Sequence, residues 1–472
     1  MQYREEIHNY IFSHKDEIVE TLKELIKIPS VRGEASENAP FGIECARVLK
    51  SIEELYKNNG FETELDLEGG YLLSYFGKGK KTLGIFGHAD VVPAGDGWTL
   101  TNPFEPIEKD GCIVGRGSMD DKSAIVMSLY CAKMLKELRI PFNSRLVMFA
   151  GANEETGMKD AQNYVAKHKI PDFSLVADSA FPLYRGNKGC VRFTVSPKEK
   201  LSKGFTINGG TASSVIGKVT AIMPFDSVLF DELNANENER LTVNKNGETI
   251  EIIAEGIAKH SALPEGGLSA LAVLSEALLK CNSLAESDLQ ILKQLYGMSN
   301  CHFGEFFSLQ NDDAEFGRLT CVLGKIETNE SGEIIVHFNI RHGIGINKDF
   351  IAEQVTSKMN QIGFSTPMYD FVSVPHSIPK ETKEIEALLN VYKDFTGDEN
   401  AVTYINAGGT YIRHIKNAVE IGLSLGGIGL SLPAGHGSVH QPDEYISIEG
   451  LLNAIELTML MLLKCDEIQK FS

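Results

Sequence analysis

Long apolar runs are absent from this 472-residue chain. Crossing a bilayer takes ~20 consecutive apolar residues, and the most apolar stretch, residues 451–463, is interrupted by Asn453 and Glu456. The first ten residues are polar and charged, without the apolar segment and cleavage site of a secretory signal. The sequence therefore predicts a cytoplasmic protein with no membrane partner.

Paired cysteines and basic residues are also scarce. The eight cysteines include no Cys-x-x-Cys pair, so we expect reduced, mostly buried thiols rather than a disulfide framework. Lysine and arginine number 45 against 64 acidic residues, and the formal charge of -19 repels phosphate backbones and anionic lipid. This charge argues against nucleic acid as a partner.

The residues that are present suit a soluble globular protein, with 43% hydrophobic and 23% charged. The length exceeds one ordinary core and suggests two domains or one domain with a large insertion. In the first 186 residues, short apolar strands alternate with helices such as 122–138, which is typical of an α/β sheet covered on both faces. The expected strands include 61–67, 71–76, 83–86, 146–150 and 173–177.

The pattern changes in the middle of the chain. Amphipathic strands and hairpins appear there, with turns at Asn246-Gly247 and Ser331-Gly332, and helices intervene. The α/β pattern then returns and ends in a helix at 448–463. We therefore predict an α/β domain with a mixed sheet, interrupted by an inserted α+β domain. The predicted ranges are 1–186 and 381–472 for the first domain and 187–380 for the insertion.

His88 and Asp90 form the first candidate motif. The apolar run before them places His88 at the carboxyl end of a strand, where open α/β sheets carry their sites. In His-x-Asp the imidazole can bind a metal while the carboxylate orients the ring. In isolation, however, the same motif is more typical of a solvated turn.

A glycine-rich segment at 115–123 contains Asp120 and Asp121 and leads into a helix. It superficially resembles a phosphate loop, but a Walker sequence has glycine before the lysine, where this chain has Asp121. Two carboxylates would also repel phosphate. Acidic residues at a helix start can equally be ordinary caps.

Glu154 and Glu155 follow the apolar strand 146–150 and provide the strongest internal signal. Because adjacent side chains point differently, one glutamate can bind a metal while the other transfers protons. A solvated acidic loop remains the alternative for this motif alone.

Asp178 ends another apolar run, and His440 closes a glycine-rich region. Together the candidates provide two imidazoles and three carboxylates, enough for two cations ~3.5–4 Å apart if one carboxylate bridges them. Five coincidental surface residues are a poorer explanation than one site. The candidate ligands are His88, Asp120, Glu155, Asp178 and His440.

A serine nucleophile is a competing hypothesis, because residues 422–426 match Gly-x-Ser-x-Gly. That elbow requires a following helix and an acid ahead of the histidine. Here Gly427, Gly429 and Pro433 follow, and Asp443 comes after both His436 and His440. The serine-hydrolase hypothesis is therefore disfavoured.

The ordered motifs resemble the di-zinc exopeptidase family of aminoacylases, acetylornithine and succinyl-diaminopimelate deacylases and bacterial dipeptidases. The resemblance spans essentially the whole chain. It rests on residues 87–93, 115–122, 153–157, 178, 408–411 and 440–444.

The resemblance implies a role for each residue of the site. Asp120 would bridge two divalent ions, zinc or manganese. His88 and Asp178 would complete one ion's site, and Glu155 and His440 the other's. Glu154 would be the general base, and Asp90 would support His88.

The inserted domain resembles the family's lid, and residues 256–265 point to His260 as a lid histidine that reaches the substrate. Within the family, the long insertion looks most like peptidase V-type dipeptidases, in which an enlarged lid lets a monomer enclose its own site. This chain departs from them near Ser214, where they carry an asparagine. The sequence therefore does not identify which residue near Ser214 would contact the oxyanion.

Arg341 and Arg413 are candidates to hold a substrate carboxylate, because guanidinium matches it bidentately. Surface ion pairs are the alternative for both. Gly409 lies in the glycine-rich segment just before Arg413 and is a further candidate substrate contact.

The sequence thus predicts a monomeric metallo-dipeptidase acting on unblocked dipeptides. The metals would polarise the scissile carbonyl and lower the pKa of water, while Glu154 takes its proton. A deacylase of N-acyl amino acids would share every ligand and differ in its pocket. A non-catalytic binding protein on the same fold is a more remote alternative.

Overall fold

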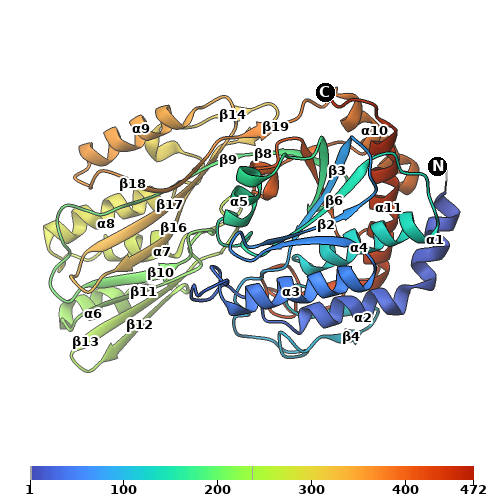
Figure 1. Ribbon diagram of the computed structural model, residues 1–472. Coiled ribbons are helices and arrows are strands. Elements are labelled where there is room, and N and C mark those ends of the chain that lie inside the picture. Colours follow the sequence, from blue (N-terminus) through green and yellow to red (C-terminus); the bar gives the residue numbers. More distant parts are fainter. Residues whose placement is uncertain (1–2, 237) are drawn as a thin grey trace. The chain divides into compact units, whose positions relative to one another are not determined.

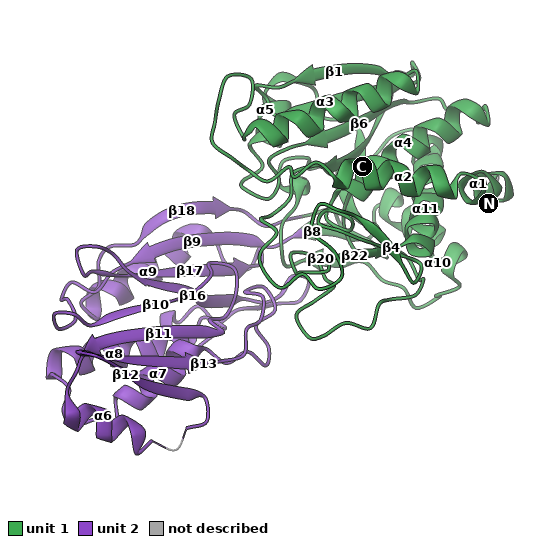
Figure 2. Cartoon of the chain, turned by 90° about the horizontal axis from the view of Figure 1, so that it is seen from below, with its two compact units in different colours: residues 1–186, 377–472 green, residues 187–376 purple. Residues whose placement is uncertain are grey.

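A computed structural model describes residues 3–236 and 238–472 (Figure 1). The chain divides into two compact units, shown in different colours in Figure 2. One comprises Met1–Gly186 with Ser377–Ser472, and the other Asn187–His376. The second unit therefore interrupts the first in sequence.

The first unit is built on a mixed sheet that has nine strands over the described residues. The order is β1-β2-β6-β3-β7-β21-β8-β19, with β20 paired to β8. Strands β6, β3, β7 and β21 run parallel, whereas β1 and β2 pair antiparallel at one edge. The strands are β1 (Glu62–Asp66), β2 (Tyr71–Phe76), β3 (Thr82–His88), β6 (Arg145–Gly151), β7 (Phe173–Ser179), β8 (Tyr184–Asn187), β19 (His376–Ser377), β20 (Tyr404–Asn406) and β21 (Ala418–Gly422).

Side chains alternate between the two faces of this sheet, and both faces are buried. In β3, Leu83 and Ile85 join the main core, whereas Phe86 belongs to a separate aromatic cluster on the other face. Helices α3, α4 and α11 contribute to the main core, and α5 contributes to the aromatic cluster. The helices are α1 (Arg4–Ser13), α2 (Lys15–Ile26), α3 (Ile43–Asn58), α4 (Lys122–Glu137), α5 (Lys159–Lys167), α10 (Lys383–Thr396), η2 (Tyr411–Arg413) and α11 (Ile448–Glu467).

A small sheet brings together two segments that are distant in sequence. Strand β5 (Cys112–Val114) pairs with β4 (Ile107–Lys109) on one side and β22 (Tyr445–Ser447) on the other. The loop after β5 therefore lies beside the segment that precedes β22.

The second unit contains an antiparallel sheet in the order β12-β13-β11-β10-β16-β17-β9-β18. Helices α7 and α8 pack together beside it. Both predicted hairpins are present, with Asn246 opposite Thr249 and Thr328 opposite Ile334. The elements are β9 (Gly189–Val195), β10 (Thr206–Gly210), β11 (Lys218–Pro224), α6 (Ser227–Asn234), β12 (Leu241–Asn246), β13 (Thr249–Glu255), α7 (Ala270–Leu278), α8 (Glu286–Ser299), η1 (Glu305–Phe307), β14 (Asp312–Asp313), β15 (Gly317–Arg318), β16 (Thr320–Thr328), β17 (Ile334–His342), α9 (Lys348–Gln361) and β18 (Met368–Ser373).

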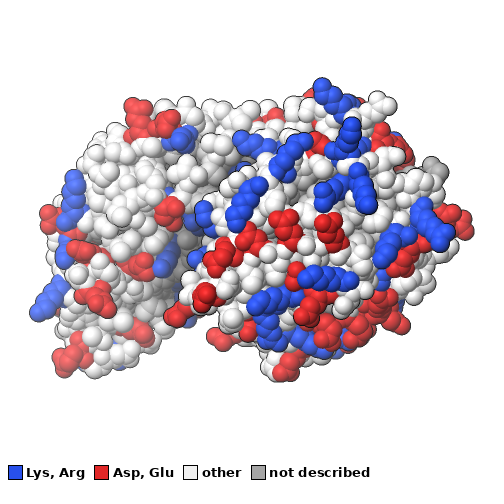
Figure 3. Space-filling view, viewed as in Figure 1, with Lys and Arg blue, Asp and Glu red and all other residues white. Residues whose placement is uncertain are grey.

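The mixed-sheet α/β unit interrupted by an α+β unit confirms the predicted fold class. All eight cysteines are free thiols, and Cys301 alone is partly exposed. Among the described residues, every helix is too short or too polar to cross a bilayer. Acidic and basic side chains are mixed on the face drawn in Figure 3, so the net charge of -19 is not gathered into one patch there.

Candidate metal centre

The carboxyl ends of three neighbouring parallel strands bring most of the candidate site together. His88 is the last residue of β3, Glu154 and Glu155 follow β6, and Asp178 lies near the end of β7. The strands are adjacent in the order β6-β3-β7, so these side chains emerge at one edge of the sheet. Asp120 joins them from the loop before α4, and His440 joins from the segment before β22.

Asp120 offers one carboxylate oxygen to each histidine. Its Oδ1 lies 3.1 Å from Nε2 of His88, and its Oδ2 lies 3.0 Å from Nε2 of His440. A carboxylate in this position can ligate two cations at once, one with each imidazole.

The remaining carboxylates divide between the two imidazoles. Glu155 Oε1 lies 3.1 Å from Nε2 of His440, and Asp178 Oδ1 lies 3.9 Å from Nε2 of His88. Two groups of ligand atoms each fit within 4.8 Å, namely those of His88, Asp120 and Glu155 and those of His88, Glu154 and Asp178.

The fully buried His88 ring is oriented by a backbone contact. Nδ1 lies 2.9 Å from the carbonyl oxygen of Asp90, which directs a proton to Nδ1 and leaves Nε2 facing the carboxylates. The Asp90 carboxylate is 3.5 Å from Nδ1, but its two oxygens accept the backbone N–H groups of Glu154 and Glu155 at 3.1 and 3.2 Å. Asp90 therefore links His88 to the loop that carries Glu154 and Glu155.

Three buried atoms test whether these residues suit a cation. His88 Nε2 and Asp120 Oδ1 lie 3.1 Å apart but make no hydrogen bond, and Glu154 Oε1 has no hydrogen-bond partner among the described residues. Unpartnered buried polar atoms are costly, and imidazole with carboxylate oxygens is the donor set of zinc and manganese. The residues therefore fit divalent metal ions.

The electrostatics of the residues alone lead to the same conclusion. Burial and then the charge of Asp178 raise the pKa of Glu154 well above its usual range. Burial opposes protonation of His440, but hydrogen bonds to Asp120 and Glu155 outweigh it and raise the pKa of that imidazole to about 11. Crowded carboxylates thus favour positive charge in their midst, which a bound cation would provide.

Neighbouring polar residues hold the Glu154-Glu155 loop in place. Asp160 is fully buried and accepts the backbone N–H of Asn153 at 2.8 Å and the hydroxyl of Tyr411 at 2.6 Å. Asp160 was not among the predicted site residues, although it stands five residues after the glutamate pair, at the start of a short helix.

The predicted substrate contacts lie in both units. Arg413 Nη2 donates to the carbonyl oxygen of Gly408 at 3.3 Å, and a Cβ on Gly409 would collide with the Arg413 guanidinium. In the second unit, Arg341 is mostly buried, and its Nε donates to Asn339 Oδ1 at 3.0 Å. His260 pairs with Ser214 in an isolated bridge, and its Nδ1 accepts the backbone N–H of Ala262 at 3.3 Å.

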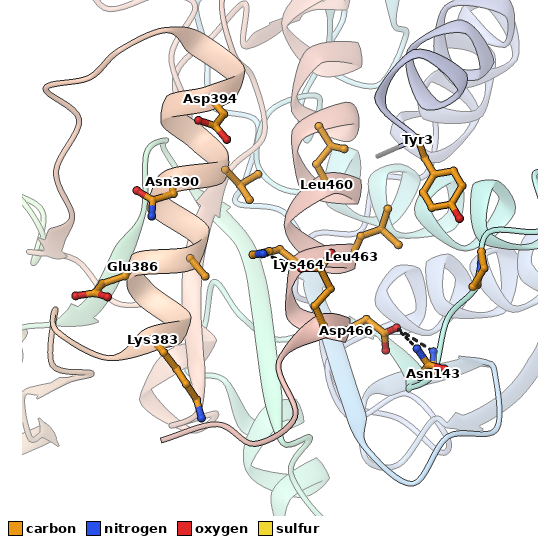
Figure 4. A pocket seen from close by; sticks show the side chains of 14 residues that line it. Tyr3, Asn143, Lys383, Glu386, Asn390, Asp394, Leu460, Leu463, Lys464 and Asp466 are labelled. Carbon is orange, nitrogen blue, oxygen red and sulfur yellow. Dashed lines mark hydrogen bonds and ion pairs between the residues drawn. The ribbon is translucent and has the colours of Figure 1, made fainter. Parts of the chain in front are cut away.

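A pocket of about 620 Å³ lies elsewhere in the first unit, between α10 and α11 (Figure 4). None of the five candidate ligands lines it. Its Asp466 accepts hydrogen bonds from Asn143 and Ser144, so this carboxylate already serves to join α11 to the loop before β6.

Comparison with known proteins identifies the family. The model of "Peptidase family M20/M25/M40" matches residues 84–464. A Staphylococcus epidermidis protein named "Putative dipeptidase" is 28% identical over 467 residues, covering 95% of this chain and 96% of that protein. A "Putative dipeptidase" of Staphylococcus aureus strain USA300 is 27% identical over 473 residues, covering 96% and 97%.

Solved structures share the fold. Human carnosine dipeptidase 1 has a TM-score of 0.62 at 16% identity, covering 99% of this chain and all of that one. The di-peptidase Dug1p of Saccharomyces cerevisiae has the same TM-score and identity and covers both chains completely. The specific likeness to peptidase V-type dipeptidases stays a prediction, but the family that the motifs indicate is confirmed. This chain belongs to peptidase family M20/M25/M40 and is a metallopeptidase.

Proposed function

We propose that this metallopeptidase is a dipeptidase that hydrolyses unblocked dipeptides with two divalent metal ions, zinc or manganese. The observation that carries the proposal is the placement of Asp120, with one oxygen facing each of two imidazoles. The names of full-length relatives as dipeptidases support the substrate class.

The residues divide into two ligand sets that share Asp120. His88 and Asp178 would hold one ion, and Glu155 and His440 the other. When bound, the ions would polarise the scissile carbonyl and acidify the attacking water. Their positive charge would also balance the crowded carboxylates.

Glu154 would act as the general base. Its side chain is buried, and its Oε1 has no hydrogen-bond partner among the described residues. Its backbone N–H is held by Asp90 at 3.1 Å. A buried carboxylate on a backbone held in this way can take a proton at Oε1 and later deliver it to the leaving amine.

The inserted unit would act as the lid and provide the remaining substrate contacts. Arg341 Nη1 is buried without a hydrogen-bond partner among the described residues, which suits an incoming carboxylate. His260 would donate to the oxyanion that develops at the scissile carbonyl. Arg413 and Gly409 are a second, competing place for the substrate carboxylate.

The proposal is tested with a panel of free dipeptides, N-acetyl amino acids and N-succinyl-diaminopimelate, with and without added zinc or manganese. We expect metal-dependent hydrolysis of the free dipeptides. Preference for the acylated compounds would replace the dipeptidase with a deacylase on the same ligands. No hydrolysis of any compound by the metal-loaded protein would favour a binding protein.

A further inference from the structure

A buried ion pair lies beside the metal centre and has no role in the function proposed above. Glu444 and Arg116 are 0% and 1% exposed, and Arg116 Nη1 lies 2.5 Å from Glu444 Oε2. Burying two charges carries a large desolvation cost, so an ion pair of this kind is weak evidence for stability. Its position in the fold instead suggests that the ion pair holds neighbouring segments in place.

One oxygen of Glu444 gathers the loop that carries Asp120. This atom, Oε1, accepts backbone N–H groups from Gly117 at 3.1 Å, Met119 at 3.0 Å and Asp120 at 3.1 Å. Gly117 has φ +86°, and a Cβ there would come within 2.9 Å of Val91, so the loop is tightly wrapped at this point. The backbone of the shared ligand is thus fixed by a single side-chain atom.

The same residue is tied to the segment that carries His440. Glu444 follows that ligand by four residues, and its carbonyl oxygen accepts the backbone N–H of Gly115 at 2.9 Å. The preceding Asp443 accepts backbone N–H groups from Thr99 at 2.9 Å and Leu100 at 3.0 Å. The segment after His440 is therefore anchored on two sides.

Arg116 extends the connection to the loop after His88. Its Nη2 donates to the carbonyl oxygen of Ala94 at 3.2 Å, and its guanidinium lies 5.5 Å from the centre of the Trp98 ring. The ion pair consequently lies where three ligand-bearing segments meet, those of His88, Asp120 and His440.

We propose that Glu444, supported by Arg116, is a positioning residue that fixes Asp120 relative to His440 and so preorganises the pair of metal sites. The proposal rests on the metal binding in the proposed function but not on its substrate. Residues that orient metal ligands typically change metal affinity by about 10- to 100-fold when they are replaced. A residue that only stabilised the fold would lower stability and leave metal affinity unchanged.

The test measures zinc affinity by chelator competition on metal-stripped protein, together with the visible absorption of the cobalt-loaded protein. Glu444→Gln keeps the size of the side chain but removes the charge that faces Arg116. We expect its zinc affinity to fall at least about tenfold, with an altered cobalt spectrum and unchanged circular dichroism.

Glu456→Gln is the matched control, because Glu456 is also buried in the first unit and pairs with His8 at 2.8 Å and Arg4 at 3.6 Å. We expect this variant to keep wild-type zinc affinity. If Glu444→Gln does not fold, Arg116→Lys keeps the charge but shortens the side chain and removes one of its two donor nitrogens, and should still weaken zinc binding severalfold.

Wild-type zinc affinity in the folded Glu444→Gln variant, or in folded Arg116→Lys where Glu444→Gln fails to fold, would overturn the positioning role. So would a wild-type protein that binds no zinc. A wild-type protein that binds zinc but cleaves no dipeptide would instead refute only the proposed substrate, because the affinity comparison needs no turnover.

Discussion

Glu155 meets His440 across the metal centre, with its Oε1 3.1 Å from Nε2 of the imidazole. The ligand atoms of both glutamates also lie near His88, those of Glu155 together with Asp120 and those of the preceding residue, Glu154, together with Asp178. Adjacent residues of one loop therefore face different parts of the site. In the proposed function, this difference separates Glu154, the proton carrier, from Glu155, the ligand.

Substitution of the two glutamates should separate these roles. Glu154→Gln removes the proton acceptor but keeps the side chain's size, so turnover should fall by about 10²- to 10⁴-fold with metal content unchanged. Glu155→Gln should instead lose affinity for one metal ion. Metal analysis and kcat on the same preparations measure both effects, and interchanged results would reverse the assignment of base and ligand.

His260→Ala should lower turnover by about 10²-fold or more, because it removes a donor to the developing oxyanion, while metal content stays constant. His337→Ala is the matched control in the same unit, since His337 pairs with Glu327 at 2.9 Å and has a structural partner of its own. Steady-state kinetics on a dipeptide measure kcat for both variants. Normal turnover in His260→Ala would remove this residue from the site.

Both charged ends of the dipeptide should contribute to recognition. The site's carboxylates favour a free ammonium, and a buried arginine favours a free carboxylate. N-acetylation or C-amidation should each reduce kcat/KM at least about tenfold, which corresponds to ~1.4 kcal/mol. A tripeptide should also be cleaved more slowly, because the proposed lid would limit the length of the substrate.

Arg341→Met tests which arginine reads the carboxylate. The substitution should reduce kcat/KM for the free dipeptide and leave the value for its C-amidated form unchanged. The same result with Arg413→Met, and none with Arg341→Met, would move the contact to the first unit.

Equal hydrolysis of N-acetylated and free compounds would contradict the dipeptidase proposal.

Glu420 should make stability depend on pH. Burial raises the pKa of this carboxyl to about 7 from 4.5, although hydrogen bonds from Asn406 and Thr410 act in the opposite direction. Because the pKa is raised in the folded state, the stability that Glu420 contributes is present below pH 4.5 and is lost as the pH rises through 7.

Urea unfolding of the metal-free protein measures this effect against Glu420→Gln, which cannot ionise. The difference in unfolding free energy should move in favour of the variant between pH 4.5 and 7, by on the order of 3 kcal/mol. Glu381→Gln, on an exposed side chain, is the control. A difference between wild type and Glu420→Gln that stays constant with pH would refute the prediction.

Local sequence patterns located part of the candidate site. His88, Glu154, Glu155 and Asp178 each follow an apolar strand, so the rule for strand ends predicts where their side chains emerge. The turn residues likewise predicted both hairpins of the second unit. The last helix was predicted to end at residue 463 but runs to Glu467, because buried Cys465 and Asp466 continue its packed face.

Long-range contacts set the limit of such prediction. The sheet order depends on packing between strands far apart in the chain, and no local pattern encodes it. Asp443 and Glu444 were visible in a family motif, but their contacts with the loops at 99–100 and 117–120 arise only when the small sheet pairs β5 with β22. Their position beside the site could therefore not be predicted from the sequence.

The most direct test of the central claim is the rate of Leu-Gly hydrolysis as zinc or manganese is returned to chelator-stripped protein. Because Asp120 would be shared by both proposed ligand sets, we predict negligible activity in the stripped protein and a rise to a plateau at about two metal equivalents per chain. Full activity in the stripped protein would contradict the claim.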